Sequence, residues 1–130
     1  MRSLLLSVAV LGLSATAAAA EFTISFQWGN TPACNNGRAK TIGNPAFVVR
    51  GLPAGTETVE FRMKDLDYPQ YNHGGGKVRM AGNGTVPAGI FKYKSPCPPS
   101  GRHTYEWTAT AQTKKNGGAL ATARAARKYP

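Results

Sequence analysis

Alternating apolar and polar residues predict several short strands in this chain. Residues 22–28 alternate with period 2, as expected of a strand with one buried face, and residues 105–111 repeat this pattern most clearly. Residues 59–63 alternate in the same way and lead directly into Asp65. Residues 46–52 form a further apolar run that ends at a Pro-Ala-Gly turn. We therefore expect a domain built mainly from strands.

Two further segments complete the predicted fold. Residues 77–80 and 85–86 flank a Gly-Asn-Gly sequence, whose glycines tolerate positive φ, so a short hairpin is expected there. Residues 119–128 are rich in Ala and Arg, which favour a short terminal helix, although Leu120, Thr122 and Tyr129 also permit an edge strand. The prediction is an antiparallel β-sandwich with a short C-terminal helix.

Residues 1–20 have the features of a secretory signal peptide. Arg2 precedes an apolar run over residues 4–13, and small residues lead to Ala20. The apolar run is too short to span a bilayer, which needs roughly twenty residues, and we expect no transmembrane segment. The prediction is cleavage after Ala20, a single domain over residues 21–130, and a periplasmic or secreted location.

The two cysteines and the charge balance add two expectations. Oxidising compartments favour disulfides, so Cys34 and Cys97 are expected to pair, with two free thiols as the alternative. The net charge of +10 attracts anions, including nucleic acid and anionic lipid surfaces. The basic residues are scattered, however, and no RNA-binding aromatic signature or helix-turn-helix pattern accompanies them. We expect no specific nucleic-acid partner, and a solvated cationic surface is the simpler interpretation.

Residues 65–78 hold the first candidate chemistry. Asp65 and Asp67 lie two apart at a strand end, which places both carboxylates on one face, and Pro69 stiffens the exit from the strand. His73 is followed by three glycines over residues 74–76, whose backbone N–H groups could form an anion-binding concavity. The alternatives are loop-capping by the aspartates and a flexible turn at the glycines.

Residues 95–107 hold the second group of residues with candidate chemistry. The element Cys97-Pro98-Pro99 is stiff backbone, and His103 and Tyr105 lie two apart at the start of the clearest predicted strand. Both side chains then point to one face, where an imidazole and a phenol can donate to an anionic oxygen. A histidine packed for structural reasons is the alternative.

The spacing D-x-D-x-P with a following His, and later P-C-P-P-x-G-x-H-x-Y, resembles the phosphatidylethanolamine-binding protein family, which includes the Raf kinase inhibitor proteins. The matching residues are Asp65, Asp67, Pro69, His73, Pro96, Cys97, Pro98, Pro99, Gly101, His103 and Tyr105. The resemblance implies an antiparallel β fold with a small pocket for phosphate-like anions and phosphoethanolamine head groups. It also implies which residues bind the ligand: Asp65, His73, Pro98, His103 and Tyr105, with Asp67 orienting or capping.

We therefore expect a non-enzymatic binding protein, a short exported form of this family, that binds a small anion or a phospholipid head group. It needs no cofactor, metal or catalytic residue. Two alternatives stay open. One is a hydrolase in which His73, His103 and Asp65 or Asp67 ligate a divalent metal that activates water. The other is an inhibitor or protein-interaction module, without the kinase-binding role of the family and with no partner specified.

Overall fold

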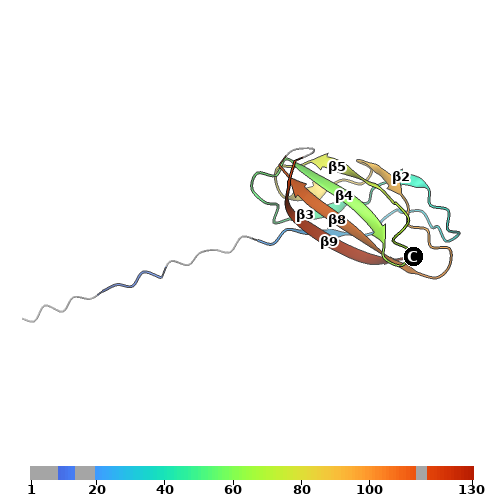
Figure 1. The fold of residues 1–130 in the computed structure, drawn as a ribbon, viewed down its shortest axis with the longest axis horizontal. Helices are drawn as coiled ribbons and strands as arrows, with labels where there is room; N and C mark the ends of the chain where they lie inside the picture. Colours follow the sequence, from blue (N-terminus) through green and yellow to red (C-terminus); the bar gives the residue numbers. More distant parts are fainter. Residues whose placement is uncertain (1–8, 14–19, 114–116) are drawn as a thin grey trace, which may run out of the picture.

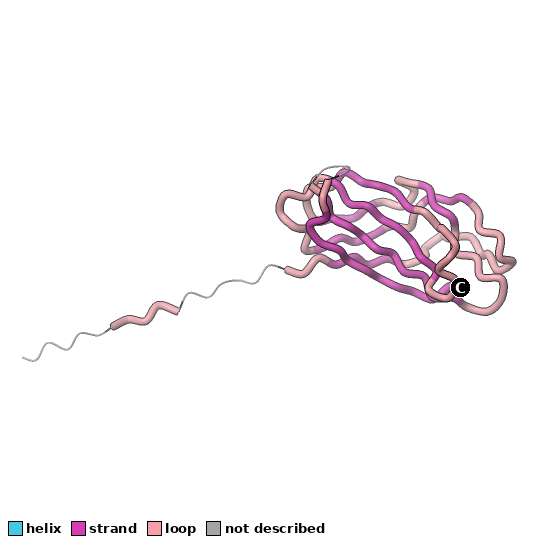
Figure 2. Tube along the Cα trace, viewed as in Figure 1, coloured by secondary structure: helices cyan, strands magenta, loops and turns pink. Residues whose placement is uncertain are grey.

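The computed structural model describes residues 9–13, 20–113 and 117–130 and contains nine strands and no helix within them (Figures 1 and 2). All strand pairs are antiparallel. The prediction of a mainly β, antiparallel fold is confirmed. Within these same ranges, no helix has the length and apolar character needed to cross a membrane.

The strands form three sheets. A three-stranded sheet has the order β1 (Thr23–Phe26), β3 (Phe47–Arg50), β6 (Gly84–Val86). A four-stranded sheet has the order β5 (Gly75–Arg79), β4 (Thr58–Asp65), β8 (His103–Gln112), β9 (Ala119–Tyr129). A two-stranded ribbon pairs β2 (Thr41–Gly43) with β7 (Lys92–Lys94).

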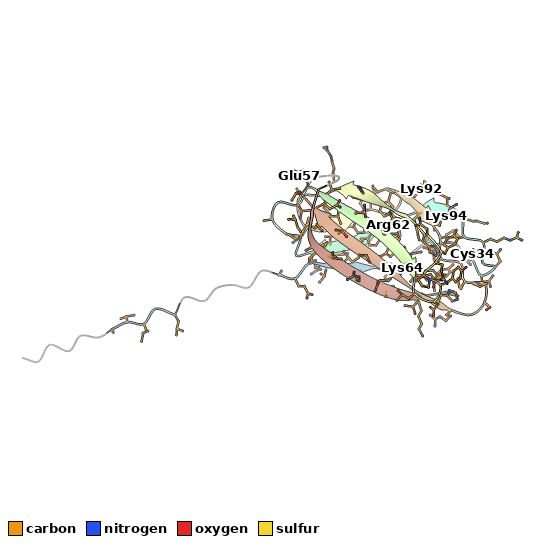
Figure 3. The ribbon with its side chains drawn as sticks, in the orientation of Figure 1. Cys34, Glu57, Arg62, Lys64, Lys92 and Lys94 are labelled. Atoms are coloured by element: carbon orange, nitrogen blue, oxygen red, sulfur yellow. A yellow bond between two sulfur atoms is a disulfide. The ribbon has the colours of Figure 1, made fainter. Side chains whose placement is uncertain are left out.

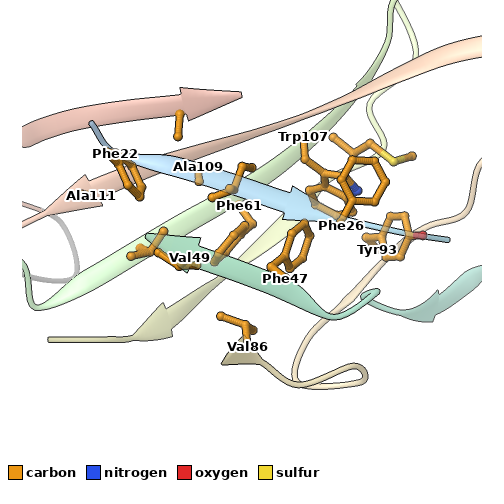
Figure 4. Close-up of a cluster of buried hydrophobic side chains, with 14 of the residues drawn as sticks. Phe22, Phe26, Phe47, Val49, Phe61, Val86, Tyr93, Trp107, Ala109 and Ala111 are labelled. Atoms are coloured by element: carbon orange, nitrogen blue, oxygen red, sulfur yellow. The ribbon is translucent and has the colours of Figure 1, made fainter. Parts of the chain in front are cut away.

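The core lies between the three-stranded and four-stranded sheets (Figure 4). Phe47 of β3 stacks on Phe61 of β4 at 4.5 Å between ring centroids, and it meets Trp107 of β8 edge-on at 5.1 Å. All three side chains are fully buried. The alternation in residues 22–28, 59–63 and 105–111 therefore identified the inward faces, because every second residue of a strand points into the core.

The predicted C-terminal helix is wrong. Residues 119–129 form β9, which pairs with β8 from Gln112↔Ala119 to His103↔Tyr129. An isolated helix of this length is marginal in water, so the Ala and Arg propensities are outweighed by hydrogen bonding along a long neighbouring strand. The inward residues are Ala121, Ala123, Ala125 and Tyr129, and Leu120 is exposed.

The predicted hairpin around Gly82-Asn83-Gly84 is also wrong. Both strands exist, but β5 pairs with β4 and β6 pairs with β3, so the turn carries the chain from one sheet to the other. The short strands β2 and β7 were not predicted, because three residues are too few to show a period.

The Cys34–Cys97 disulfide is present and closes a loop of sequence separation 63, which confirms the predicted pairing. The predicted signal peptide falls largely outside the described residues, since residues 1–8 and 14–19 are not among them.

Candidate functional site

The end of β4 and the start of β8 lie side by side and bring the two candidate stretches together. The antiparallel register pairs Asp65, the last residue of β4, with Tyr105, so His103 lies two residues farther along, beside the turn that follows β4. A cavity of about 260 Å³ opens at this point. Its lining residues are Gly37, Ala39, Asp65, Asp67, Tyr68, Tyr71, His73, Cys97, Pro99, His103 and Tyr105.

Asp65 is buried and organises one wall of the cavity. Its Oδ2 accepts a hydrogen bond from His103 Nδ1 at 2.6 Å, since a carboxylate facing this nitrogen leaves the ring as the donor. Its Oδ1 accepts from the backbone N–H groups of Asp67 at 2.9 Å and Tyr68 at 3.2 Å. Asp65 therefore fixes the orientation of His103 and the turn after β4 together, and His103 keeps Nε2 for a ligand.

His73 forms a second wall and is also buried. Its Nδ1 donates to the backbone carbonyl of Lys94 at 2.7 Å, and its ring meets the edges of Tyr71 and Tyr105 at 4.6 and 5.5 Å between centroids. Burial lowers the pKa of His73, and the carbonyls of Lys94 and Ser95 and the carboxylate of Asp65 oppose this only in part. Neutral His73 therefore offers Nε2 as a hydrogen-bond acceptor.

Tyr105 lies between the two histidines. Its hydroxyl oxygen accepts a hydrogen bond from the backbone N–H of Cys97 at 3.2 Å. Burial raises the pKa of this phenol, and the carboxylate of Asp65 acts in the same direction. Tyr105 therefore remains protonated and can donate its hydroxyl proton.

Asp67 occupies the mouth of the cavity and is exposed. Its Oδ2 accepts from the backbone N–H of Thr104 at 2.7 Å, which fastens the turn after β4 to the start of β8. This is the orienting or capping role that the resemblance implied, and the same residue lines the cavity. Asp65 also accepts hydrogen bonds from backbone N–H groups of this turn. Both carboxylates therefore stabilise the turn and line the cavity.

Five of the six predicted ligand-binding residues line this cavity: Asp65, Asp67, His73, His103 and Tyr105. The sixth, Pro98, is fully buried and does not belong to the lining, whereas its neighbours Cys97 and Pro99 do. The glycines after His73 do not line the cavity either. Gly75 begins β5, and a side chain there would collide with the backbone carbonyl of Phe61. Close strand approach, rather than an anion cradle, explains that glycine.

Sequence reasoning did not assign six of the lining residues to the site: Gly37, Ala39, Tyr68, Tyr71, Cys97 and Pro99. Gly37 and Ala39 follow Cys34 and reach the cavity because the disulfide fastens their segment to Cys97. Tyr68 and Tyr71 lie inside the first candidate stretch, and two tyrosines in a polar loop were a usable signal.

One group of possible metal ligands occurs among the described residues. Ligand atoms of Asp65, Asp67 and His103 all lie within 4.8 Å of one another. His73 does not belong to this group. Ligand atoms of His73, His103 and a carboxylate, the set of the hydrolase alternative, therefore do not all lie within this distance of one another, although these residues line the same cavity.

The cavity differs in charge from the rest of the protein. None of the Lys and Arg residues that the structure describes lines it, while two of the six acidic residues, Asp65 and Asp67, do. Its acceptors are the carboxylate oxygens of Asp65 and Asp67 and the Nε2 atom of neutral His73. The site therefore suits a ligand that brings its own N–H donors as well as an anionic group.

No protein-family model and no curated protein matches the chain. Solved structures do match, among them two homologues of the phosphatidylethanolamine-binding proteins. A homologue of phosphatidylethanolamine-binding protein from Chlamydia trachomatis superposes with a TM-score of 0.56 and 19% identity, over 68% of this chain and 81% of its own. YbcL of Escherichia coli, described as a member of the mammalian family of these proteins, has a TM-score of 0.61 and 15% identity, over 85% of this chain and 98% of its own. The chain therefore has the fold of the phosphatidylethanolamine-binding proteins, as the motif spacing predicted.

Proposed function

We propose that this chain is a non-enzymatic binding protein for small phosphorylated head groups of the phosphoethanolamine type. We further propose that it acts in the periplasm or outside the cell, which agrees with the disulfide. The observation that carries the binding proposal is one cavity holding the Asp65–His103 pair, His73 and Tyr105. The fold shared with proteins named for binding phosphatidylethanolamine supports it.

The two ends of such a ligand match different parts of the wall. His103 with a proton on each nitrogen donates from Nε2 to a phosphate oxygen, while Asp65 balances its charge from Nδ1. An ammonium group finds acceptors at His73 Nε2 and at the Asp67 carboxylate. Inorganic phosphate lacks this second set of contacts, and no Lys or Arg within the described ranges lines the cavity to replace it, so it is the weaker ligand.

The non-enzymatic part of the proposal rests on the groups available in the cavity. Among the described residues no Ser or Thr lines its wall, and Cys97 is held in the disulfide. The raised pKa of Tyr105 disfavours the phenolate that nucleophilic attack requires. These features favour binding without covalent chemistry.

Titration calorimetry tests the proposal with phosphoethanolamine and inorganic phosphate as separate ligands. His103→Ala should weaken phosphoethanolamine binding about tenfold to a hundredfold, because it removes one charge-assisted hydrogen bond. Glu106→Gln is the matched control, since Glu106 lies on the opposite face of β8. Absence of heat with the wild type, or equal heat with both variants, would contradict the proposal. Release of free phosphate during the titration would contradict its non-enzymatic part.

A further inference from the structure

A second groove lies apart from the cavity that contains His103. Its volume is about 720 Å³, against about 260 Å³ for that cavity, and no described residue lines both. The groove, called the β1 groove below, is lined by residues 25–32, residues 42–46, Val48, Ala88, Gly89 and Arg127. A groove of this volume is within the usual range of sites for small molecules.

The walls of the β1 groove are mostly apolar. Phe26, Trp28, Ile42 and Val48 contribute large apolar side chains, and Val48 is 38% exposed. The indole Nε1 of Trp28 donates to the backbone carbonyl of Lys128 at 2.8 Å, which holds this ring in place. A ligand with an apolar body would therefore remove carbon surface from water when it binds here.

The loops around the groove are already ordered by Asn44, whose side chain is buried. Its Nδ2 donates to the carbonyls of Pro45 and Pro87 at 2.8 and 3.1 Å. Its Oδ1 accepts from the backbone N–H of Phe91 at 2.8 Å. The backbone N–H of Gly89 donates to the carbonyl of Asn44 at 3.0 Å. Because these bonds join two distant loops, a ligand does not have to order them.

One cation is fixed at the wall of the groove. Arg127 lies at an inward-facing position of β9, opposite the buried Tyr105 of β8. Since β9 is an edge strand, the side chain can extend past the sheet, and its guanidinium carbon lies 5.8 Å from the ring centroid of Phe26. Its Nε donates to the backbone carbonyl of Phe26. These two contacts hold the guanidinium in one position.

The charge of Arg127 is unbalanced. Within the described ranges it is the only charged residue of the lining, and it makes no ion pair. Its two terminal amino groups make no hydrogen bond with the described residues. The cations labelled in Figure 3 do not line the groove: Arg62, Lys64, Lys92 and Lys94. A single guanidinium with free terminal N–H groups is suited to two parallel hydrogen bonds to a carboxylate.

We propose that the β1 groove is a second binding site, which binds a monocarboxylate with an aliphatic chain, such as a fatty acid. The carboxylate accepts hydrogen bonds from the terminal amino groups of Arg127, and the chain covers the apolar walls. A phosphate monoester carries about two negative charges, and one guanidinium balances only one of them. A peptide would bring backbone N–H and carbonyl groups that mostly apolar walls leave unsatisfied.

Titration calorimetry tests the site with octanoate and octanol, which share a chain length and differ in the carboxylate. The wild type should bind octanoate about tenfold more tightly or better, because only octanoate makes charge-assisted hydrogen bonds. Octanoate should also produce a saturable change in tryptophan fluorescence. Trp28 lines the groove, whereas Trp107, the other tryptophan of the chain, is fully buried in the core.

Arg127→Gln should reduce the affinity for octanoate to that for octanol, since glutamine carries no charge. Arg124→Gln is the matched control, because Arg124 is an exposed arginine of the same strand and does not line the groove. It should bind octanoate as the wild type does. Equal loss in both variants would overturn the role of Arg127, as would equal affinity of the wild type for the two ligands.

A second pair of variants leaves Arg127 intact. Val48→Asp places a negative charge in the groove and should weaken octanoate binding about tenfold or more. Leu120→Asp, which changes an exposed apolar residue outside the lining, should bind octanoate like the wild type. Circular dichroism checks that all four variants are folded. If Arg127→Gln does not fold, undiminished binding by Val48→Asp would still overturn the site.

The remaining outcomes separate this site from other interpretations. Absence of heat with both ligands would overturn it. A dimer in analytical ultracentrifugation that Val48→Asp dissociates would assign the groove to a contact between two copies of the chain, and would also overturn it. Arg127→Gln should bind phosphoethanolamine like the wild type, and His103→Ala should bind octanoate like the wild type. The β1 groove and the proposed function can therefore fail independently.

Discussion

Asp65 determines much of the site by itself. This one carboxylate orients His103, holds two backbone N–H groups of the turn and lies against Tyr105. A buried carboxylate is tolerated only when its oxygens are satisfied, and here both oxygens accept hydrogen bonds. The structural and binding interpretations of this residue are therefore not alternatives, because the bonds that cap the turn also build the cavity wall.

The second histidine allows a test by pH. Burial holds the pKa of His73 below its ordinary value of 6.5, so the unfolded chain binds more protons once the pH falls below about 6.5. The contribution of His73 to the free energy of unfolding should then decrease as the pH falls from 6.5 through the pKa that His73 has in the folded protein. Urea unfolding at several pH values between 7.5 and 4.5 measures this decrease.

His73→Asn supplies the comparison for that experiment, since Asn does not titrate and can still donate to the carbonyl of Lys94. The difference in stability between wild type and variant should shrink toward acid pH. A constant difference across this range would show that burial does not perturb His73. The other titratable groups are present in both proteins and cancel in the difference.

At the scale of elements, β8 connects the core to the site. Its inward residues Tyr105, Trp107, Ala109 and Ala111 are buried, and its first residue, His103, reaches the cavity. Both roles follow from one alternation of side chains along ten residues. A strand that is fixed by core packing is a rigid support for a binding residue at its end.

The strand β9 allows a test of the corrected element. Ala126 is exposed and lies opposite Glu106 of β8. Ala126→Thr should raise the free energy of unfolding by a few tenths of a kcal/mol, up to about 1, because β-branched residues suit strands. In a helix the same change would lower it by roughly 0.5 kcal/mol. The sign of the shift in urea midpoint distinguishes the two, and a decrease would argue against the strand.

At the scale of the whole molecule, the disulfide joins distant parts of the chain at the site. Cys97 lines the cavity and donates its N–H to Tyr105, while Cys34 donates its N–H to the Tyr129 hydroxyl at 3.1 Å. Gly37 and Ala39 lie between Cys34 and β2 and complete the wall. The bridge therefore stabilises the fold and positions one side of the cavity.

Removal of the bridge should affect stability and binding together. Cys34→Ala with Cys97→Ala should lower the free energy of unfolding by about 4 kcal/mol in the chain-entropy model, given a separation of 63 residues. Urea unfolding measures this loss. Phosphoethanolamine binding should weaken as well, under conditions where circular dichroism shows the variant still folded. Unchanged affinity would mean that the wall near Gly37 does not need the bridge.

Much of this arrangement could be predicted from the sequence, and the failures have physical reasons. Alternation located β1, β4 and β8, an apolar run before a turn located β3, and strand-end placement located Asp65 and His103. The hairpin failed because glycines permit a turn without deciding which sheet each arm joins. The predicted helix over residues 119–128 was wrong because helix propensity reflects only the residues of the segment itself. Pairing with the free edge of β8 depends on another strand, which propensity does not describe.

The sequence by itself determined the mainly β class, the buried faces of the main strands and the identity of most chemical groups in the cavity, because these depend on side-chain period and residue type. Only the tertiary structure decided the sheet in which each strand lies, the partners of Asp65 and the place of Tyr68 and Tyr71 at the cavity. Pairing, burial and a cavity depend on residues far apart in the chain, and their positions are settled only when the sheets pack together.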